Sequence, residues 1–245
     1  MSSIVNDFFE KTFVLNMSSE HQNIPVIERR MKHVNIDYAI FNAVNGKASK
    51  FDKFWELYNG RPVSTDLEKS YKKKFIESRG AFGYLKTMER LLGDAIKNKY
   101  DSILVFDNDC LFDLDFETKA KKWLQQINKD KWKVLLFGAS DYGLSSFSPS
   151  SPHYTPVKLK TCGSFALGIH NSVFKEVLNE LSKMETPFDN LPLGNVYEKY
   201  TEQCFVAYPN IVIADVKYSS IRGARNLESH SKLMHWALAN FNTNS

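Results

Sequence analysis

Apolar residues occur along this chain in two alternating patterns, short strand-like runs and longer stretches with helical spacing. The strand-like runs are rich in β-branched and aromatic residues, and the clearest are residues 12–16, 36–40, 102–106 and 134–137. Between the first two runs, apolar residues recur at steps of three and four and so share one helix face: Ile24, Ile27, Met31 and Val34. Because strands alternate with helices, the pattern predicts an α/β fold with a mainly parallel central sheet flanked by helices.

The same alternation predicts the later elements. Helical spacing over residues 82–96 and 123–127 precedes the runs that end at residues 106 and 137. The remaining elements expected are a strand at 164–169, a helix opening near Asn171, a strand pair at 205–208 and 211–213, and a last helix that carries apolar residues from 233 to 241 on one arc.

Two segments do not follow the alternation. Residues 143–161 are rich in serine and proline, and we expect a mobile surface loop there, either a lid over a binding site or a disordered excursion. Residues 1–10 are expected to form an N-terminal tail. With no internal repeat and no linker, the simplest prediction is a single domain over residues 1–245.

Composition excludes several classes of protein. The 245 residues are 43% hydrophobic and carry a net charge of only +4, which is typical of a globular chain and not of a disordered one. No apolar run approaches the roughly 20 residues that cross a bilayer, so no transmembrane segment is predicted. The three widely spaced cysteines and the lack of a signal-peptide pattern favour a cytoplasmic location. The basic residues are scattered without a nucleic-acid-binding motif, so no nucleic-acid partner is expected, and the oligomeric state stays open.

The strand-like run 102–106 leads directly into Asp107, Asn108 and Asp109. In open α/β sheets ligands bind beyond the carboxyl ends of the strands, so these aspartates lie where a site is expected. Two adjacent carboxylates repel each other unless a cation compensates, and Mg²⁺ or Mn²⁺ bound to them could also hold a diphosphate. The alternative is an Asx turn with both aspartates in solvent. A second acidic pair, Asp113 and Asp115, is expected to face solvent or to cap a helix.

Several stretches together resemble glycosyltransferase family 25, the lipooligosaccharide and collagen galactosyltransferases, and their order and spacing agree with the family. They are KTFVLNM (11–17), IDYAIFNAVNGK (36–47), RGAFGYLKT (79–87), YDSILVFDNDC (100–110), CGSFALGIHNSVFKEVL (162–178), TPFD (186–189) and YPNIVIADVKYSSIR (208–222). The resemblance implies a GT-A fold, a Rossmann-like nucleotide-sugar transferase fold. It also implies a metal-dependent, inverting transfer of a sugar from a nucleotide-sugar donor, a UDP-sugar, to a hydroxyl group of a glycan acceptor.

The resemblance also implies roles for individual residues. Asp107 and Asp109 would bind the metal and the diphosphate, Arg79 the ribose or phosphate, and Asp189 would act as the base. The uridine would lie against the end of the first strand, at Val14, Leu15 and Asn16. The chain departs from the family pattern where Asn108 replaces a central acid and where Thr87 and Met88 lie near the place of a Ser-His pair. A catalytically inactive GT-A-like binding protein is therefore the alternative.

Other residues have both a functional and a structural interpretation. His153 is an alternative base, His230 or His235 could reach the metal, and Arg222 and Arg225 could hold phosphate or form surface ion pairs. Trp55 and Tyr58 could stack on an acceptor sugar.

Overall fold

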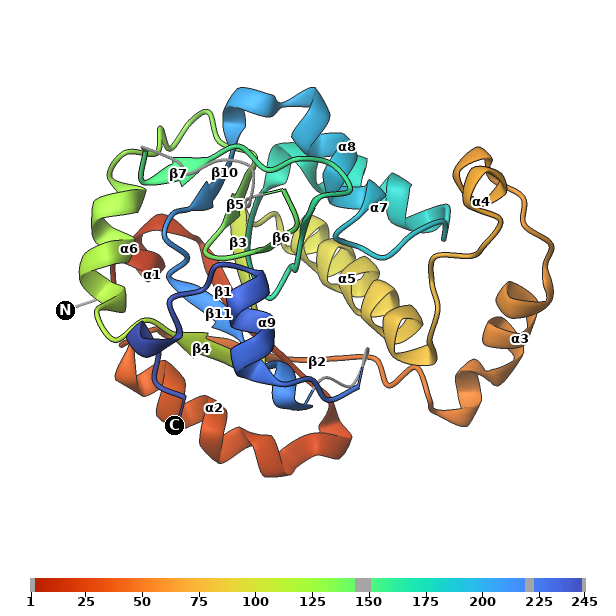
Figure 1. Ribbon diagram of the computed structural model, residues 1–245, viewed down its shortest axis with the longest axis horizontal. Helices are drawn as coiled ribbons and strands as arrows, with labels where there is room; N and C mark the ends of the chain where they lie inside the picture. Colours follow the sequence, from red (N-terminus) through yellow and green to blue (C-terminus); the bar gives the residue numbers. More distant parts are fainter. Residues whose placement is uncertain (1–2, 144–150, 219–222, 244–245) are drawn as a thin grey trace.

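The computed structural model describes residues 3–143, 151–218 and 223–243, and its centre is a seven-stranded sheet (Figure 1). The strand order is β2 (Ala39–Asn42), β1 (Lys11–Asn16), β3 (Ser102–Asp107), β9 (Ala166–His170), β5 (Val134–Leu136), β10 (Cys204–Ala207) and β7 (His153–Tyr154). β1 pairs parallel with β2 and β3, and β5 pairs parallel with β10, whereas β9 and β7 run antiparallel to their neighbours. The predicted α/β fold with a mainly parallel sheet is confirmed.

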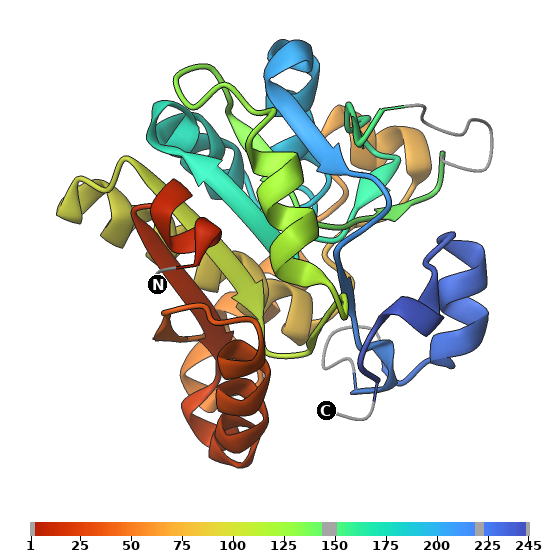
Figure 2. The same ribbon diagram turned by 90° about the vertical axis from the view of Figure 1, so that its left-hand side faces the viewer.

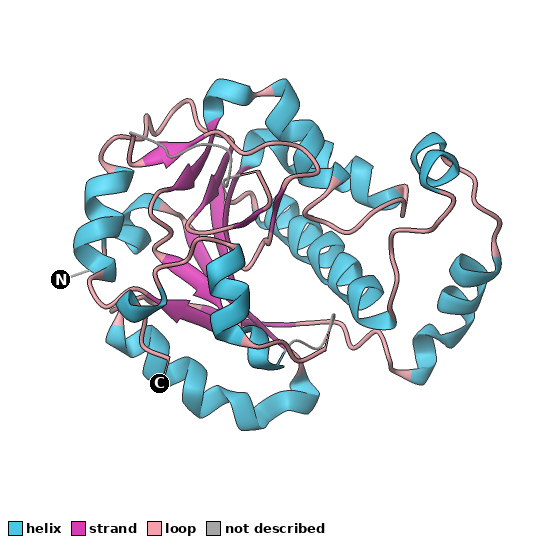
Figure 3. Cartoon of the chain, in the orientation of Figure 1, coloured by secondary structure: helices cyan, strands magenta, loops and turns pink. Residues whose placement is uncertain are grey.

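Helices cover both faces of the sheet, as the colouring by secondary structure shows (Figure 3). One face carries α1 (Ile4–Phe8), α2 (Ile24–His33) and α6 (Phe116–Leu124), the face seen in Figure 2. The other face carries α5 (Arg79–Asn98), α7 (Phe174–Ser182) and α8 (Leu191–Lys199). Successive strand residues alternate between the two cores: Leu104 packs on the first face and Ile103 and Val105 on the second.

Smaller elements surround this sandwich. Two short antiparallel pairs join β4 (Cys110–Phe112) to β11 (Val212–Ala214) and β6 (Ser140–Asp141) to β8 (Thr161–Cys162). Helices α3 (Asp52–Gly60) and α4 (Asp66–Tyr71) stand apart from the sheet, at the right of Figure 1. Among the described residues the last α-helix is α9 (Leu227–Leu233), which a short 3₁₀ turn (Leu238–Asn240) follows. Among the described residues, every helix is too short or too polar to cross a membrane.

Three expectations about the chain's course are wrong. The tail expected over residues 1–10 is wrong for the described residues 3–10, because residues 4–8 form α1 and the side chains of Val5 and Phe9 are buried. The strands expected as a pair belong to different sheets, since β10 joins β5 and β11 joins β4. The last helix ends at Leu233, because His235 adopts a left-handed backbone (φ 55°) that an α-helix does not contain.

The predicted mobile loop at 143–161 falls only partly on residues that can be compared. Residues 144–150 lie outside the described part of the chain. Beyond them, His153 and Tyr154 pair with β10, and Thr161 and Cys162 pair with β6, so parts of this segment belong to strands.

Candidate functional site

A cavity of about 710 Å³ opens at the carboxyl ends of β1 and β3, the edge at which ligands of open α/β sheets bind. Leu15 and Asp107 are register partners at the end of the two strands, so residues far apart in the sequence meet there. The cavity wall also includes the loop after β2, the first turn of α5, and residues 162–165 and 187–189.

The acidic pair lies inside this cavity, as its position after the strand predicts. Burial, and then the charge of Asp109, raise the pKa of Asp107 well above its usual value, while the nearby Tyr84 hydroxyl opposes the rise. Burial and then the charge of Asp215 raise the pKa of Asp109 to about 6, while Arg30 and Arg225 oppose that rise. Two neighbouring carboxylates that are costly to ionise favour either protonation or a cation.

A metal ion fits this pair. The Oδ1 atom of Asp109 is buried and accepts no hydrogen bond from any described residue, although buried polar atoms in proteins are nearly always paired. Carboxylate oxygens are the ligands that Mg²⁺ and Mn²⁺ prefer. Among the described residues no group of three or more His, Cys, Asp or Glu side chains is arranged to hold a metal. The remaining ligands of such an ion would have to come from water or from a bound anion.

Asn108, between the two aspartates, links the end of β3 to the end of β1. Its Nδ2 donates to Oδ1 of Asn16 at 2.8 Å, and the Glu20 carboxylate lies 3.4 Å from the same nitrogen. The backbone nitrogen of Asp107 in turn donates to the carbonyl of Phe165 at 2.8 Å, on the turn before β9. The turn that carries the acidic pair is therefore held on two sides by its neighbours.

Positive groups face the same cavity. Arg225 lines it, and its backbone nitrogen donates to the carbonyl of Val216. The first turn of α5, a helix of 20 residues, also lines it, and the N-terminus of a helix attracts anions. Of the two arginines considered for phosphate, Arg225 lines the cavity, and Arg222 lies outside the described residues.

Asp189 also lines the cavity. It is half-buried, and its Oδ2 accepts a hydrogen bond from the backbone nitrogen of Gly163 at 2.7 Å. This contact orients the carboxylate on the turn between α7 and α8. The structure therefore brings Asp189 together with Leu15, Asn16, Asp107 and Asp109 around one cavity.

Val14 and Arg79 do not line the cavity. Val14 is buried in the core on the opposite face of the sheet from Leu15, because neighbouring strand residues point in opposite directions. The Arg79 guanidinium forms an ion pair with Asp52, and its Nε donates to the carbonyl of Gly46 at 3.0 Å. These contacts fasten the beginning of α5 to the segment after β2.

The histidines that were candidates for the base or the metal do not line the cavity. His153 lies on β7 with its ring 4.8 Å from that of Phe205, and His230 packs against Trp236 at 5.1 Å. Neither histidine lines the cavity, and neither does His235.

Asp113 does not face solvent: it is buried, forms an ion pair with Lys119 at 2.6 Å and accepts a hydrogen bond from the backbone nitrogen of Asp115.

Some cavity residues were not among the sequence candidates. Glu20 reaches the site because the chain turns back after β1, and Tyr84 because it lies one turn inside α5 on the side of the sheet. The Tyr84 hydroxyl is 2.8 Å from Oγ of Ser164, so it joins α5 to the turn before β9. Tyr84 is a polar residue within an apolar helix stripe, and this pattern could have indicated it as a site residue.

Comparison with known proteins gives only distant likenesses. No protein family matches the sequence, and no curated protein matches it. Among solved structures, a glycosyltransferase involved in the glycosylation of the major capsid of PBCV-1 is 9% identical, with 92% of this chain and 98% of that chain covered and a TM-score of 0.45. A197 from STIV is 13% identical over 88% of this chain and 97% of that chain, with a TM-score of 0.32. Mannose-1-phosphate geranyltransferase from Thermus thermophilus is 10% identical over 80% of this chain and 73% of that chain, with a TM-score of 0.37. Likenesses this distant do not define an activity, which has to be inferred from the site.

Proposed function

We propose that this chain is a metal-dependent glycosyltransferase that moves a sugar from a nucleoside diphosphate donor, a UDP-sugar, to a hydroxyl group of a glycan acceptor. The observation that carries the proposal is the pair Asp107 and Asp109, two carboxylates with raised pKa values at a strand end, one of them with a buried oxygen that has no partner among the described residues. The resemblance of the sequence to glycosyltransferase family 25 supports the same chemistry.

Asp107 and Asp109 would hold Mg²⁺ or Mn²⁺, with the diphosphate supplying further oxygen ligands. The bound ion would neutralise negative charge on the diphosphate as it leaves the sugar. Arg225 and the first turn of α5 would attract the same anion from the cavity wall. Leu15 and Asn16 would contact the nucleoside, because they end the strand beside the acidic pair.

Asp189 would act as the base on the acceptor. In an inverting transfer the acceptor oxygen bonds to the anomeric carbon from the face opposite the diphosphate while the bond to the diphosphate oxygen breaks. The proton of the acceptor hydroxyl would pass to Asp189. Its Oδ2 accepts from Gly163, and no hydrogen bond from a described residue occupies Oδ1, so that oxygen is available to a hydroxyl.

The test is the melting temperature of the protein with UDP-galactose, UDP-glucose and GDP-mannose, each with Mn²⁺ and with EDTA. A ligand that binds only the folded chain raises the melting temperature, so we expect a rise that needs both Mn²⁺ and a UDP-sugar. The double variant Asp107→Asn/Asp109→Asn should lose that rise. Asp115→Asn, a change at an exposed aspartate of the second acidic pair, should keep it.

A release assay for UDP separates catalysis from binding. Release that is stimulated by a glycan acceptor and lost in Asp189→Asn would support the transferase. Metal-dependent donor binding without any release would favour the inactive binding protein. An unchanged donor response in the double variant would refute the metal site.

A further inference from the structure

Residues 49–75, here named the arm, form a projection beside the cavity. They contain a short 3₁₀ turn (Ser49–Phe51), α3 and α4, and they project away from the central sheet (Figure 1). The arm joins the body next to the cavity, since Lys47 before it and Phe75 at its end both line the cavity wall.

The inward face of α3 explains how the arm is attached. Phe51, Trp55 and Tyr58 recur at helical spacing and pack toward α5. The rings of Phe51 and Trp55 lie 6.1 and 6.0 Å from the ring of Phe82. These aromatic contacts cover the side of α3 that faces α5, and the opposite side is open to solvent.

The outward face of α3 is also apolar, and nothing in the described structure covers it. Phe54 is 61% exposed and Leu57 is 64% exposed, and Tyr71 at the end of α4 is 61% exposed. Within α3, Lys53 and Phe54 precede Leu57 by four and three residues, so the three side chains share one face. Lys50 lies in the 3₁₀ turn just before α3, with its Nζ 5.3 Å from the centre of the Phe51 ring. Exposed apolar side chains grouped in this way indicate an interaction surface.

The arm also concentrates the positive charge of the chain. Residues 49–75 contain seven lysines and arginines and four acidic residues, a net charge of +3 out of +4 for the whole chain. Asp52 pairs with Arg79, which lies outside the arm, whereas Glu68 pairs with Arg61 and Asp66 with Lys69 inside it. Lys50 and Lys53 form no ion pair with any residue of the described ranges.

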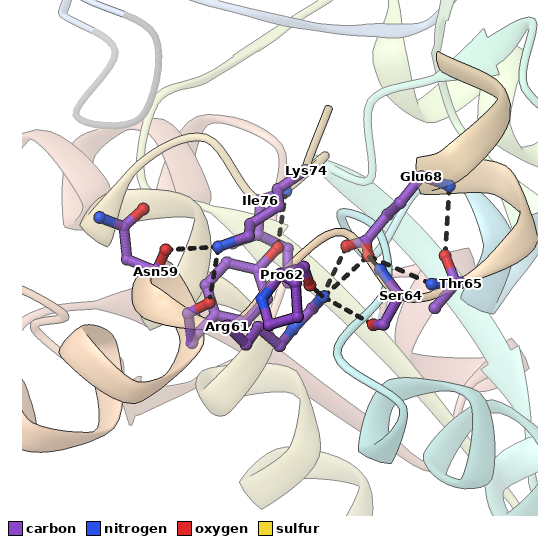
Figure 4. Close-up of polar contacts among 9 residues, drawn as sticks. Asn59, Arg61, Pro62, Ser64, Thr65, Glu68, Lys74 and Ile76 are labelled. Atoms are coloured by element: carbon purple, nitrogen blue, oxygen red, sulfur yellow. Dashed lines mark hydrogen bonds and ion pairs between the residues drawn. The ribbon is translucent and has the colours of Figure 1, made fainter. Parts of the chain in front are cut away.

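A buried polar network holds the two helices of the arm in place (Figure 4). Arg61 donates to both carboxylate oxygens of Glu68, at 2.8 and 2.6 Å, and this contact lowers the pKa of the fully buried Glu68 to about 2. Glu68 also completes a capping box with Thr65 at the start of α4. Lys74 donates to the carbonyls of Tyr58 and Asn59. Because the network fixes the arm, the exposed face is presented without a large loss of conformational entropy on docking.

We propose that the arm docks on the surface of an anionic lipid bilayer, with Phe54 and Leu57 in the headgroup region and Lys50 and Lys53 against lipid phosphates. Aromatic and aliphatic side chains bordered by lysines are typical of helices that lie in a membrane interface. A nucleic-acid surface would account for the lysines but not for an exposed Leu57, which cannot stack on bases as an aromatic ring does. Docking would hold the cavity close to the membrane, and it does not depend on the proposed transferase activity.

Co-sedimentation of the full chain with vesicles tests the proposal. We expect binding to phosphatidylcholine vesicles that contain about 30% phosphatidylglycerol, little binding to phosphatidylcholine alone, and weakening by salt. Phe54→Ser/Leu57→Ser should lower the partition coefficient roughly tenfold or more. The control is Leu114→Ser/Leu233→Ser, which removes leucines that are 60% and 61% exposed elsewhere and should leave binding unchanged.

A second pair of variants tests the charge. Lys50→Gln/Lys53→Gln should lower the partition coefficient about fivefold per lysine. Lys121→Gln/Lys122→Gln, at exposed positions of α6, changes the net charge equally and should have a small effect. Melting temperatures close to that of the parent would show that all four variants fold. The proposal is overturned if the chain does not sediment with anionic vesicles. It is also overturned if the test and control pairs lose binding equally. Binding to an oligonucleotide that only the Lys50/Lys53 change abolishes would likewise overturn it.

Discussion

At the scale of single residues, the site is defined by carboxylates whose surroundings oppose their charge. The backbone nitrogen of Asp215 donates to the carbonyl of Asp109 at 2.9 Å, so β11 brings a third acid close to the pair. Arg30 and Arg225 compensate only in part, since the pKa of Asp109 remains raised. A divalent cation would reverse the balance by making the charged form favourable.

Replacing Asp109 with Asn should stabilise the protein without metal at high pH. The pKa of Asp109 is about 6 in the folded chain against an ordinary value of 3.8. Above pH 6 the folded chain therefore holds a carboxylate whose charge is disfavoured, which lowers the free energy of unfolding. We expect Asp109→Asn to raise the free energy of unfolding in EDTA at pH 8, by about 3 kcal/mol at most. The gain should shrink as the pH falls through 6 toward 4. Urea unfolding at pH 8 and pH 5 measures this, with Asp115→Asn as the control, and destabilisation at pH 8 would contradict it.

At the scale of elements, the wall of the cavity depends on a backbone contact between α5 and the segment after β2. A Cβ at Gly83 would lie 2.7 Å from the nitrogen of Gly46 and the carbonyl of Val44. Thr87, one turn later, accepts a hydrogen bond from the nitrogen of Val44 at 2.9 Å. Only a glycine lets the two segments approach this closely, and Gly46 itself lines the cavity.

Two glycine substitutions in α5 should have opposite signs. Gly83→Ala should destabilise the protein by about 1–3 kcal/mol, because its methyl group meets backbone atoms that cannot move aside. Gly93→Ala adds a methyl group where no atom lies within 4 Å, so it should stabilise the helix by about 0.5–1 kcal/mol. Urea unfolding of the two variants provides the comparison. Equal effects would show that the helix does not touch the segment at Gly83.

At the scale of the whole molecule, the beginning of the chain packs against its middle. Phe9, just after α1, lies 5.5 Å from the ring of Trp132 and 6.0 Å from that of Phe137, and a Cβ at Gly168 would collide with its ring. The sheet itself takes β1, β2 and β3 from the first half of the chain and its other strands from the second half. The N-terminal segment therefore joins two parts of the core that are distant in sequence.

Phe9→Ala should lower the free energy of unfolding by about 3–5 kcal/mol, because it empties a fully buried site at that junction. The matched variant is Phe8→Ala, which removes the same ring from a partly exposed position and should cost clearly less. Denaturant unfolding compares the two. Similar losses in both variants would mean that the N-terminal segment does not form part of the core.

Local pattern was sufficient for the elements that build the middle of the sheet. The run 102–106 and the stripe over 82–96 appear as β3 and α5, because a continuous apolar run and a helical repeat are each a direct consequence of burial. Local pattern was insufficient for Asp113, which lies in the core with Lys119, and for the strands after residue 204, which choose partners in different sheets. Which strands pair with each other cannot be read from the spacing of apolar residues within a single segment.

The sequence by itself determined the α/β class and the position of Asp107 and Asp109 at a strand end, since both follow from the order of apolar and polar residues. Only the tertiary structure decided which residues share the cavity. It placed Asp189, Glu20 and Arg225 beside that strand end and directed Arg79 to Asp52. It also decided that Phe54 and Leu57 would remain exposed, because α3 has apolar residues on two faces and the body of the molecule covers one of them.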